Sequence, residues 1–176
     1  GRQGRRRSSE NPVRGRREFQ LRRIAQRFEM LRNRGEKALI PFITAGDPDL
    51  ETTEALVLAL EEAGADLVEI GIPFSDPIAE GPVIQRASER ALARGTNLRQ
   101  ILDLVSRLRG RVEIPLLLMG YVNPIFAMGT ENFAKAASEA GVDGVIVPDL
   151  PPEEGEDLHA ALEATGVDLV LLAAPT

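Results

Sequence analysis

The chain of 176 residues is long enough for one domain with a hydrophobic core. Its 43% hydrophobic and 27% charged residues are ordinary for a globular protein. The absence of cysteine excludes a disulfide framework and thiolate chemistry, and a single histidine leaves little material for a metal site. No apolar run approaches the roughly 20 residues of a membrane-spanning helix, so we expect a cytoplasmic protein without membrane contact.

The net charge of −6 is unevenly distributed. Residues 1–18 carry seven arginines and two glutamates, a net +5, which leaves −11 for the rest of the chain. An acidic body argues against nucleic-acid binding by the folded part. The basic tail is predicted to be disordered, because it has almost no apolar residues. It could bind nucleic acid or direct import, but we favour an incidental extension, since charge runs are usually only solvated.

Short apolar runs alternate with helical patterns through residues 19–176, which we interpret as one domain. The pattern predicts strands at 38–44, 66–71, 114–119, 143–148 and 168–173. It predicts helices at 51–63, 80–93, 98–109, 131–140 and 153–164, preceded by an amphipathic helix with the stripe Leu21, Ile24, Phe28 and Leu31. Other apolar stripes are Leu56, Leu60 and Ala63; Ile101, Leu102, Val105 and Leu108; and Phe133, Ala137 and Ala140. The strands lack polar alternation, which is typical of strands buried on both faces.

One short pattern occurs three times, as AGADLV (63–68), AGVDGV (140–145) and TGVDLV (165–170). Each copy reads helix end, Gly, one residue, Asp and strand, which indicates repeated βα units and a parallel sheet. A doubly wound open sheet and a (βα)8 barrel both have such a sheet. The chain stops at Thr176 without a closing helix, and no GxGxxG follows the first strand. We therefore expect an α/β fold of the (βα)8 TIM-barrel type, incomplete, with about five of eight strands and an N-terminal capping helix.

Barrel enzymes place their active site at the carboxyl ends of the strands and in the loops that follow. Among those positions, Glu69 lies between Val68 and Ile70 in an apolar strand. Burial raises the pKa of a carboxyl group toward the range useful for proton transfer. A structural Glu would need a buried cationic partner, and no predicted strand contains Lys or Arg. We therefore favour a catalytic Glu69 over a structural one.

The loop after the second strand is unusually long, which is typical of functional loops. It carries two acidic residues, Asp76 and Glu80. Ser-Asp-Pro is also a good turn sequence, and an acid at the start of the helix at 80–93 would be favoured by the helix dipole. The spacing alone therefore leaves both a structural and a functional role open.

Further polar and aromatic residues near the strand ends are less specific. Asp149 follows the fourth strand and could cap a helix or bind substrate. Phe42 could be a core residue, and Tyr121 and Asn123 stand in an Asn-Pro turn context. His159 falls in the last predicted helix, away from the strand ends, and is expected to be packed or solvated.

Four long segments resemble the tryptophan synthase alpha chain family in order. They are PFITAGDPDLETT (41–53), GADLVEIGIPFSDPIAEGPVIQRAS (64–88), LLLMGYVNPIFAMG (116–129) and GVDGVIVPDLPPEE (141–154). The resemblance extends from about residue 20 to the end of the chain. It implies a (βα)8 barrel and a lyase of tryptophan biosynthesis, which splits indole-3-glycerol phosphate into indole and glyceraldehyde 3-phosphate by retro-aldol cleavage.

The resemblance also implies roles for individual residues. Glu69 matches the catalytic acid/base that protonates the indole ring carbon. Glu80 stands where the family motif usually has Asp, the partner of the indole N–H, and Glu reaches about 1.5 Å further, a distance that can matter for rate. Substrate-pocket positions are matched by Phe42, Tyr121 and Asp149. Positions facing a partner chain are matched by Asp76, Asn123, Pro124 and Phe126.

The family works with a beta chain, to which the indole passes. The resemblance therefore implies a heterotetramer of two alpha and two beta chains, with pyridoxal phosphate in the beta chain and no cofactor or metal in this one. The family holds the substrate phosphate in Gly-rich loops after strands six to eight, which this sequence does not contain. We therefore expect these 176 residues to be inactive alone.

Two alternatives remain open. One is a non-catalytic half-barrel that serves only to bind a beta chain. The other is a different phosphate-sugar barrel enzyme, such as an aldolase or isomerase. Such enzymes often use a strand-end Lys for a Schiff base, and the absence of Lys from the predicted strands counts against that alternative.

Overall fold

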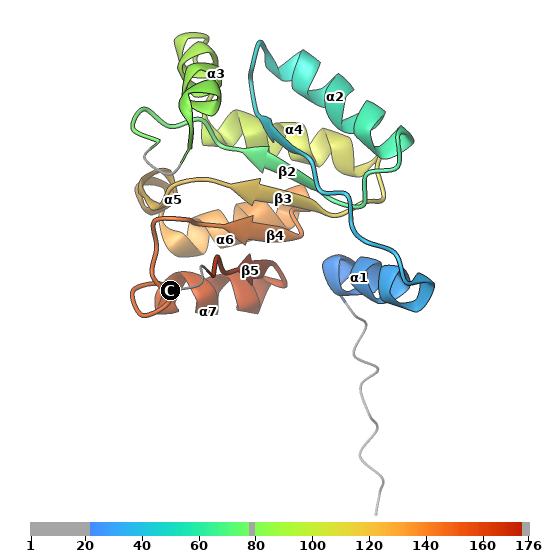
Figure 1. Cartoon of the computed structure of the whole chain (residues 1–176). Helices are drawn as coiled ribbons and strands as arrows, with labels where there is room; N and C mark the ends of the chain where they lie inside the picture. Colours follow the sequence, from blue (N-terminus) through green and yellow to red (C-terminus); the bar gives the residue numbers. More distant parts are fainter. Residues whose placement is uncertain (1–21, 78–79, 174–176) are drawn as a thin grey trace, which may run out of the picture.

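A five-stranded parallel sheet forms the centre of the molecule (Figure 1). The computed structural model describes residues 22–77 and 80–173, so the basic tail of residues 1–18 lies outside the described part. The strands are β1 (Phe42–Thr44), β2 (Val68–Gly71), β3 (Leu116–Met119), β4 (Gly144–Ile146) and β5 (Asp168–Val170). Their order in the sheet follows their order in the chain, with β1 and β5 at the edges. This arrangement confirms the predicted partial barrel.

Each strand is shorter than predicted. Leu39 and Ile40 before β1 are exposed and lie outside the paired register of the strand, although Leu39 O accepts a hydrogen bond from Asp66 N. Leu171 after β5 is exposed and lies outside the register as well. Both segments continue edge strands, which have a neighbour on one side only. An apolar run therefore predicts the position of a strand better than its ends, because the ends depend on pairing.

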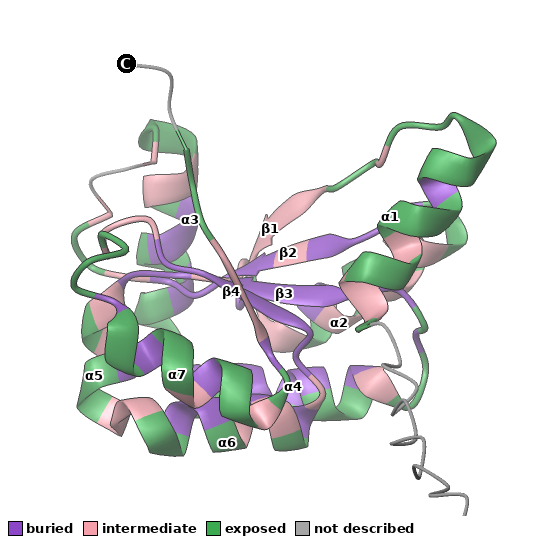
Figure 2. Cartoon of the chain, turned by 90° about the horizontal axis from the view of Figure 1, so that it is seen from below, coloured by how far each residue is buried: buried purple, intermediate pink, exposed green. Residues whose placement is uncertain are grey.

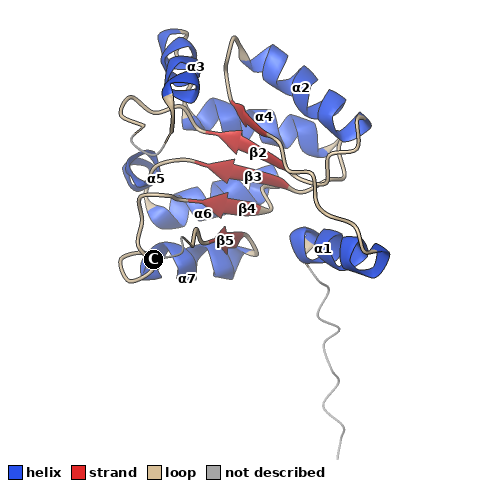
Figure 3. Ribbon diagram, in the orientation of Figure 1, coloured by secondary structure: helices blue, strands red, loops and turns tan. Residues whose placement is uncertain are grey.

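The helices are α1 (Arg23–Arg34), α2 (Leu50–Glu62), α3 (Pro82–Ala93), α4 (Leu98–Arg109), α5 (Val122–Met128), α6 (Thr130–Ala140) and α7 (Glu156–Thr165). Helices α2, α4, α6 and α7 cover the outer face of the sheet, whereas α1 lies apart from this layer (Figure 3). The apolar faces of α2, α4, α5, α6 and α7 form one large core cluster with Val68, Ile70, Leu116 and Leu118 of the central strands. Within the described ranges, no helix has the length and apolar character needed to cross a bilayer.

The predicted helix stripes are confirmed in α4 and α6, where the predicted apolar residues are buried. In α2 the prediction is wrong, because Leu56 is 41% exposed while Thr53 and Val57 are buried. Four consecutive apolar residues, 57–60, follow Leu56, so periodicity alone does not fix which side of this helix faces the sheet. In α1, Leu31 is buried as predicted, whereas Phe28 is 40% exposed. Leu21 lies outside the described residues.

A second, smaller core lies on the inner face of the sheet. Leu67, Leu117 and Ile146 are buried there, and Ile24 of α1 packs against them. A Cβ atom on Gly144 would lie 2.8 Å from Ile24 Cδ1, so a larger residue here would force the end of the Ile24 side chain to move. Figure 2 shows α1 beside the amino-terminal ends of the strands. The predicted N-terminal capping helix is confirmed.

In each of the three similar segments, the Asp forms an ion pair with an arginine of α1 or with the arginine just before this helix. Arg27 lies 3.7 Å from Asp66. Arg23 lies 2.5 Å from Asp143, and Arg22 lies 2.5 Å from Asp168. The repeat therefore does more than connect a helix to a strand, since it presents a row of carboxylates to the capping helix.

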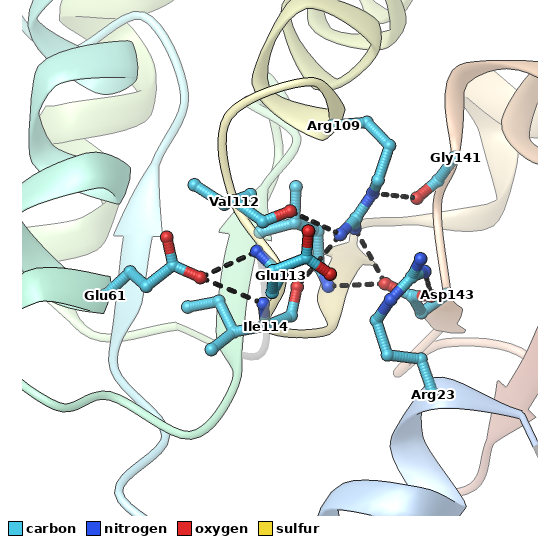
Figure 4. A network of polar contacts seen from close by, with 9 residues as sticks. Arg23, Glu61, Arg109, Val112, Glu113, Ile114, Gly141 and Asp143 are labelled. Atoms are coloured by element: carbon cyan, nitrogen blue, oxygen red, sulfur yellow. Dashed lines mark hydrogen bonds and ion pairs between the residues drawn. The ribbon is translucent and has the colours of Figure 1, made fainter.

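Asp143 is the most buried of the three carboxylates, at 9% exposure, and forms the centre of a polar network (Figure 4). Its Oδ2 accepts hydrogen bonds from Arg109 Nη2 at 2.7 Å and from the backbone N–H of Leu116 at 2.8 Å. Burial lowers the pKa of Arg109, while the charge of Asp143 raises it. The neighbouring loop is held by Glu61, whose Oε1 accepts from two consecutive backbone N–H groups. This network joins α1, α4 and β3.

We predict that Asp143→Ala lowers the free energy of unfolding by about 3 kcal/mol or more, because it leaves a largely buried guanidinium without its counter-charge. Asp168→Ala is the matched control, since it removes a more exposed ion pair of the same helix and should cost less than about 1 kcal/mol. Urea denaturation of both variants measures the difference. Equal losses in the two variants would contradict the central role of Asp143.

Candidate active site

The carboxyl ends of the five strands meet at one edge of the sheet because all strands are parallel. Glu69 is the second residue of β2, and its register partners are Phe42 on β1 and Leu117 on β3. Register partners point to the same side of a sheet, so all three side chains face inward. The Phe42 ring lies over Gly71, where an added Cβ would be 2.5 Å from Phe42 Cζ. The inner face beside Glu69 is therefore apolar.

The electrostatic setting of Glu69 follows from these neighbours. Burial raises the pKa of the Glu69 carboxyl above its ordinary value. Among residues 22–77 and 80–173, no hydrogen bond or ion pair reaches this carboxylate. The group is half-buried, neutral over a wider pH range than an exposed Glu and not engaged by a structural partner.

Glu80, the second predicted acid, contacts Tyr121 rather than Glu69. The Tyr121 hydroxyl donates a hydrogen bond to Glu80 Oε2. Tyr121 is itself buried, and its ring stacks on Phe74 at a centroid distance of 5.0 Å. Helix α3 begins at Pro82 rather than at residue 80, and Gly81 is its N-cap. The side chain of Glu80 therefore engages the neighbouring strand end, which weakens the interpretation of Glu80 as a helix-start acid.

Asp149 lies in the loop after β4, and its Oδ1 accepts a hydrogen bond from the backbone N–H of Val122 at 3.0 Å. Val122 is the first residue of α5, so Asp149 caps a helix that precedes it in the chain. The Asn-Pro turn expected around Asn123 is instead the first turn of α5. Pro fits this turn because its missing N–H would have no partner there.

The four residues predicted to face a partner chain lie on the rim of this edge. Asp76 and Asn123 are exposed, and Phe126 is 51% exposed. Pro124 is partly buried. Ser75 Oγ donates to Asp76 Oδ2 at 2.6 Å, and both residues lie in a bend of the chain. No hydrogen bond or ion pair within the described ranges joins any of the four to Glu69, which lies in β2.

Two further residues at the site were missed by the sequence interpretation. Thr44 Oγ1, at the end of β1, is buried and has no hydrogen-bond partner in the described part of the chain. Gln85, in the first turn of α3, donates to backbone carbonyls of the loop that carries Glu80. A Thr at a strand end and a Gln in a helix carry no signal that distinguishes them from ordinary packing. His159 is exposed on α7, away from the strand ends.

No group of three or more His, Asp or Glu side chains within 22–77 and 80–173 is arranged to hold a metal ion. The acids at this edge are separated by their own partners, with Glu80 bonded to Tyr121 and Asp149 bonded to α5. The chemistry that the site offers is therefore proton transfer from a desolvated carboxyl group on an apolar surface.

Comparisons with known proteins agree with this geometry. The model of the family "Tryptophan synthase alpha chain" matches residues 28–176. The tryptophan synthase alpha chain of Geobacter sp. (strain M21) is 61% identical over 154 residues, which is 88% of this chain and 58% of that protein. The crystal structure of the alpha subunit from Legionella pneumophila str. Paris is 47% identical with a TM-score of 0.83, covering 85% of this chain and 57% of that one.

A chain in a structure of the tryptophan synthase α2β2 complex from Pyrococcus furiosus is 44% identical, with a TM-score of 0.75. The match covers 78% of this chain and 58% of that one. The parallel sheet with its covering helices defines part of a (βα)-barrel protein. Within that class, the chain belongs to the tryptophan synthase alpha chain family. It spans somewhat less than three-fifths of the length of the relatives it matches.

The raised pKa of Glu69 predicts a pH-dependent stability. Because the folded state favours the neutral acid, stability falls as the pH rises from the unfolded pKa, near 4.5, through the higher folded pKa. Glu69→Gln should therefore be more stable than the parent chain at pH 7 and equal to it near pH 3. Urea unfolding at both pH values, with the exposed Glu29→Gln as control, measures this. A constant difference across this pH range would contradict the prediction.

Proposed function

We propose that the complete protein cleaves indole-3-glycerol phosphate to indole and glyceraldehyde 3-phosphate, and that this chain supplies its acid/base residues. The observation that carries the proposal is Glu69, a half-buried carboxyl group with a raised pKa and without a structural partner among the described residues. Its place on the second strand is the one that the family resemblance assigns to the catalytic Glu. Desolvation raises the pKa of such a group, which increases the fraction that carries the proton a general acid needs.

In the proposed reaction, Glu69 gives a proton to the indole ring carbon that bears the glycerol chain. The bond from this carbon to the glycerol carbon then breaks, while the hydroxyl on that glycerol carbon gives its proton to the now ionised Glu69 and becomes the aldehyde. Indole and glyceraldehyde 3-phosphate leave, and the number of protons is unchanged. Positive charge develops on the indole nitrogen during the first step, so an anion near its N–H lowers the barrier.

Glu80 is the proposed partner of the indole N–H. Its longer side chain, where the family usually has Asp, is held by the hydroxyl of Tyr121 on the neighbouring strand end. This contact limits the freedom of the extra methylene group, which supports the idea that Glu can replace Asp. The walls of the substrate pocket are proposed to include Phe42, Tyr121 and Asp149. Phe42 lines the inner face beside Glu69, and Asp149 fixes the start of α5.

The family's phosphate-binding loops follow strands six to eight, and the described residues form a sheet of five strands. We therefore propose the activity for the complete barrel and not for these residues alone. The cytoplasmic location remains part of the same proposal, and cell fractionation would test it.

We further propose a tryptophan synthase beta chain, carrying pyridoxal phosphate, as the partner in a heterotetramer of two alpha and two beta chains. The similarity of this chain to one in the α2β2 complex of Pyrococcus furiosus supports this partnership. The rim at the carboxyl ends of the strands is the proposed contact surface. Phe126 there is 51% exposed, and Val83 at the start of α3 is 67% exposed. Apolar side chains this open at the mouth of a site suit a protein partner.

The activity is tested with Glu69→Gln in the complete protein. Loss of the general acid should lower kcat by roughly 100-fold or more, with little change in KM, because the neutral amide keeps the shape of the side chain. Steady-state release of indole measures both constants, and the exposed Glu62→Gln on α2 is the control. A Glu69→Gln enzyme with normal kcat would refute the assignment, and an inactive parent protein would favour the non-catalytic binding module.

The contact surface is tested with Asp76→Lys. Charge reversal on the exposed rim should weaken binding of the beta chain and its stimulation of indole release, since like charges then meet across the interface. Asp157→Lys on α7, away from the rim, is the control for a change of net charge. Titration calorimetry with the beta chain gives the affinities. If Asp76→Lys instead lowers the melting temperature and leaves the affinity intact, Asp76 has only its turn role.

A further inference from the structure

The loop that carries Glu80 is closed by one side chain of the following helix. Gln85 lies in the first turn of α3 and is partly buried. Its Nε2 donates to the carbonyl of Glu80 at 2.9 Å and to the carbonyl of Pro77 at 3.3 Å. These two carbonyls lie on either side of residues 78 and 79. A single amide group therefore links both ends of this short segment to α3.

Helix α3 is in turn fixed to the loop after β1. Arg90, in its last turn, forms two hydrogen bonds to Asp47, at 2.8 Å and 2.7 Å. Close behind, the side chain of Thr96 fills the space over Gly46, so the loop and the end of α3 fit tightly. Ala87 and Ala91 are buried against the body of the molecule. The element from which Gln85 reaches out is thus anchored independently of the loop it holds.

We infer that Gln85 is a positioning residue that sets the place of the Glu80 carboxylate through the loop backbone. Gln85 donates its two hydrogen bonds to carbonyl groups, which a carboxylate or an apolar side chain at this position cannot do. Without them, the backbone of Glu80 loses its link to α3, and the contact between Glu80 and Tyr121 is weakened. The catalytic part of this inference rests on the proposed function, whereas the structural part does not.

The single tyrosine of the chain provides a direct readout. The chain has one Tyr and no Trp, so its intrinsic emission comes from Tyr121. A phenol that donates a hydrogen bond to a carboxylate emits weakly, because the excited hydroxyl passes its proton to the acceptor. Because Tyr121 donates such a bond to Glu80, we expect its emission to be quenched in the parent chain. Loss of the contact should therefore raise the tyrosine emission.

The experiment compares the emission of Gln85→Glu and Gln85→Met with that of the parent chain. Glu80→Ala serves as the reference for a lost contact. The matched control is Gln100→Glu in the first turn of α4, where the side chain accepts a hydrogen bond from Asn97 N and Glu can do the same. We expect both Gln85 variants to gain emission in the direction of Glu80→Ala, and Gln100→Glu to match the parent. Far-ultraviolet circular dichroism shows whether each variant is folded.

The outcomes separate the inference from the proposed function. Folded Gln85 variants with the parent's emission would overturn the inference, and so would a Glu80→Ala variant without a gain, because the contact would then be absent. In the complete protein, Gln85→Met should lower kcat by about tenfold or more, since a misplacement of about 1 Å can cost roughly 100-fold. An unchanged kcat would overturn the catalytic part. A parent protein without lyase activity would refute the proposed function and leave the emission result standing.

Discussion

All five strands run in the same direction, and this constraint makes the two ends of the sheet structurally different. Parallel pairing places every helix-to-strand turn at one end of the sheet and every strand-to-helix loop at the other. The first end repeats one short sequence, whereas the second end has loops of unequal length and composition. Register then fixes which side chains meet, so that Phe42, Glu69 and Leu117 form one inward row across three strands.

At the amino-terminal ends of the strands, two of the three repeated Asp residues each form both a backbone hydrogen bond and an ion pair. Asp66 accepts the backbone N–H of Leu39 at 2.8 Å, and Asp143 accepts that of Leu116 at 2.8 Å. Each of these carboxylates thus joins its own strand to the start of the preceding strand in the sheet and also pairs with an arginine of α1. At the carboxyl end, by contrast, the carboxylate of Glu69 has no partner among the described residues. A carboxylate is therefore paired with arginine at one end of the sheet and desolvated without such a partner, among the described residues, at the other.

The sequence was sufficient for features that depend on local pattern. Repeated apolar runs and the Gly-x-Asp turn predict five parallel strands and their neighbours, and the apolar context of Glu69 predicts its perturbed pKa. Features that depend on contacts between distant segments were not predictable in this way. The hydrogen bond from Tyr121 to Glu80 joins two loops 41 residues apart, and Asp149 reaches back 27 residues to cap α5. Helix α5 itself has seven residues, too few for a periodic pattern.

The ion pairs that hold α1 against the sheet also have a consequence for the order of folding. Arg23 meets Asp143 across 120 residues and Arg22 meets Asp168 across 146, so these contacts close very long loops. Closing such loops is slow compared with forming neighbouring βα units, each of which pairs with the one before it. Among the described elements, we therefore expect α1 to dock last, although it is the first of them in the chain. Until it docks, Leu67, Leu117 and Ile146 stay uncovered on the inner face of the sheet, and the growing chain exposes an apolar surface that other chains can bind.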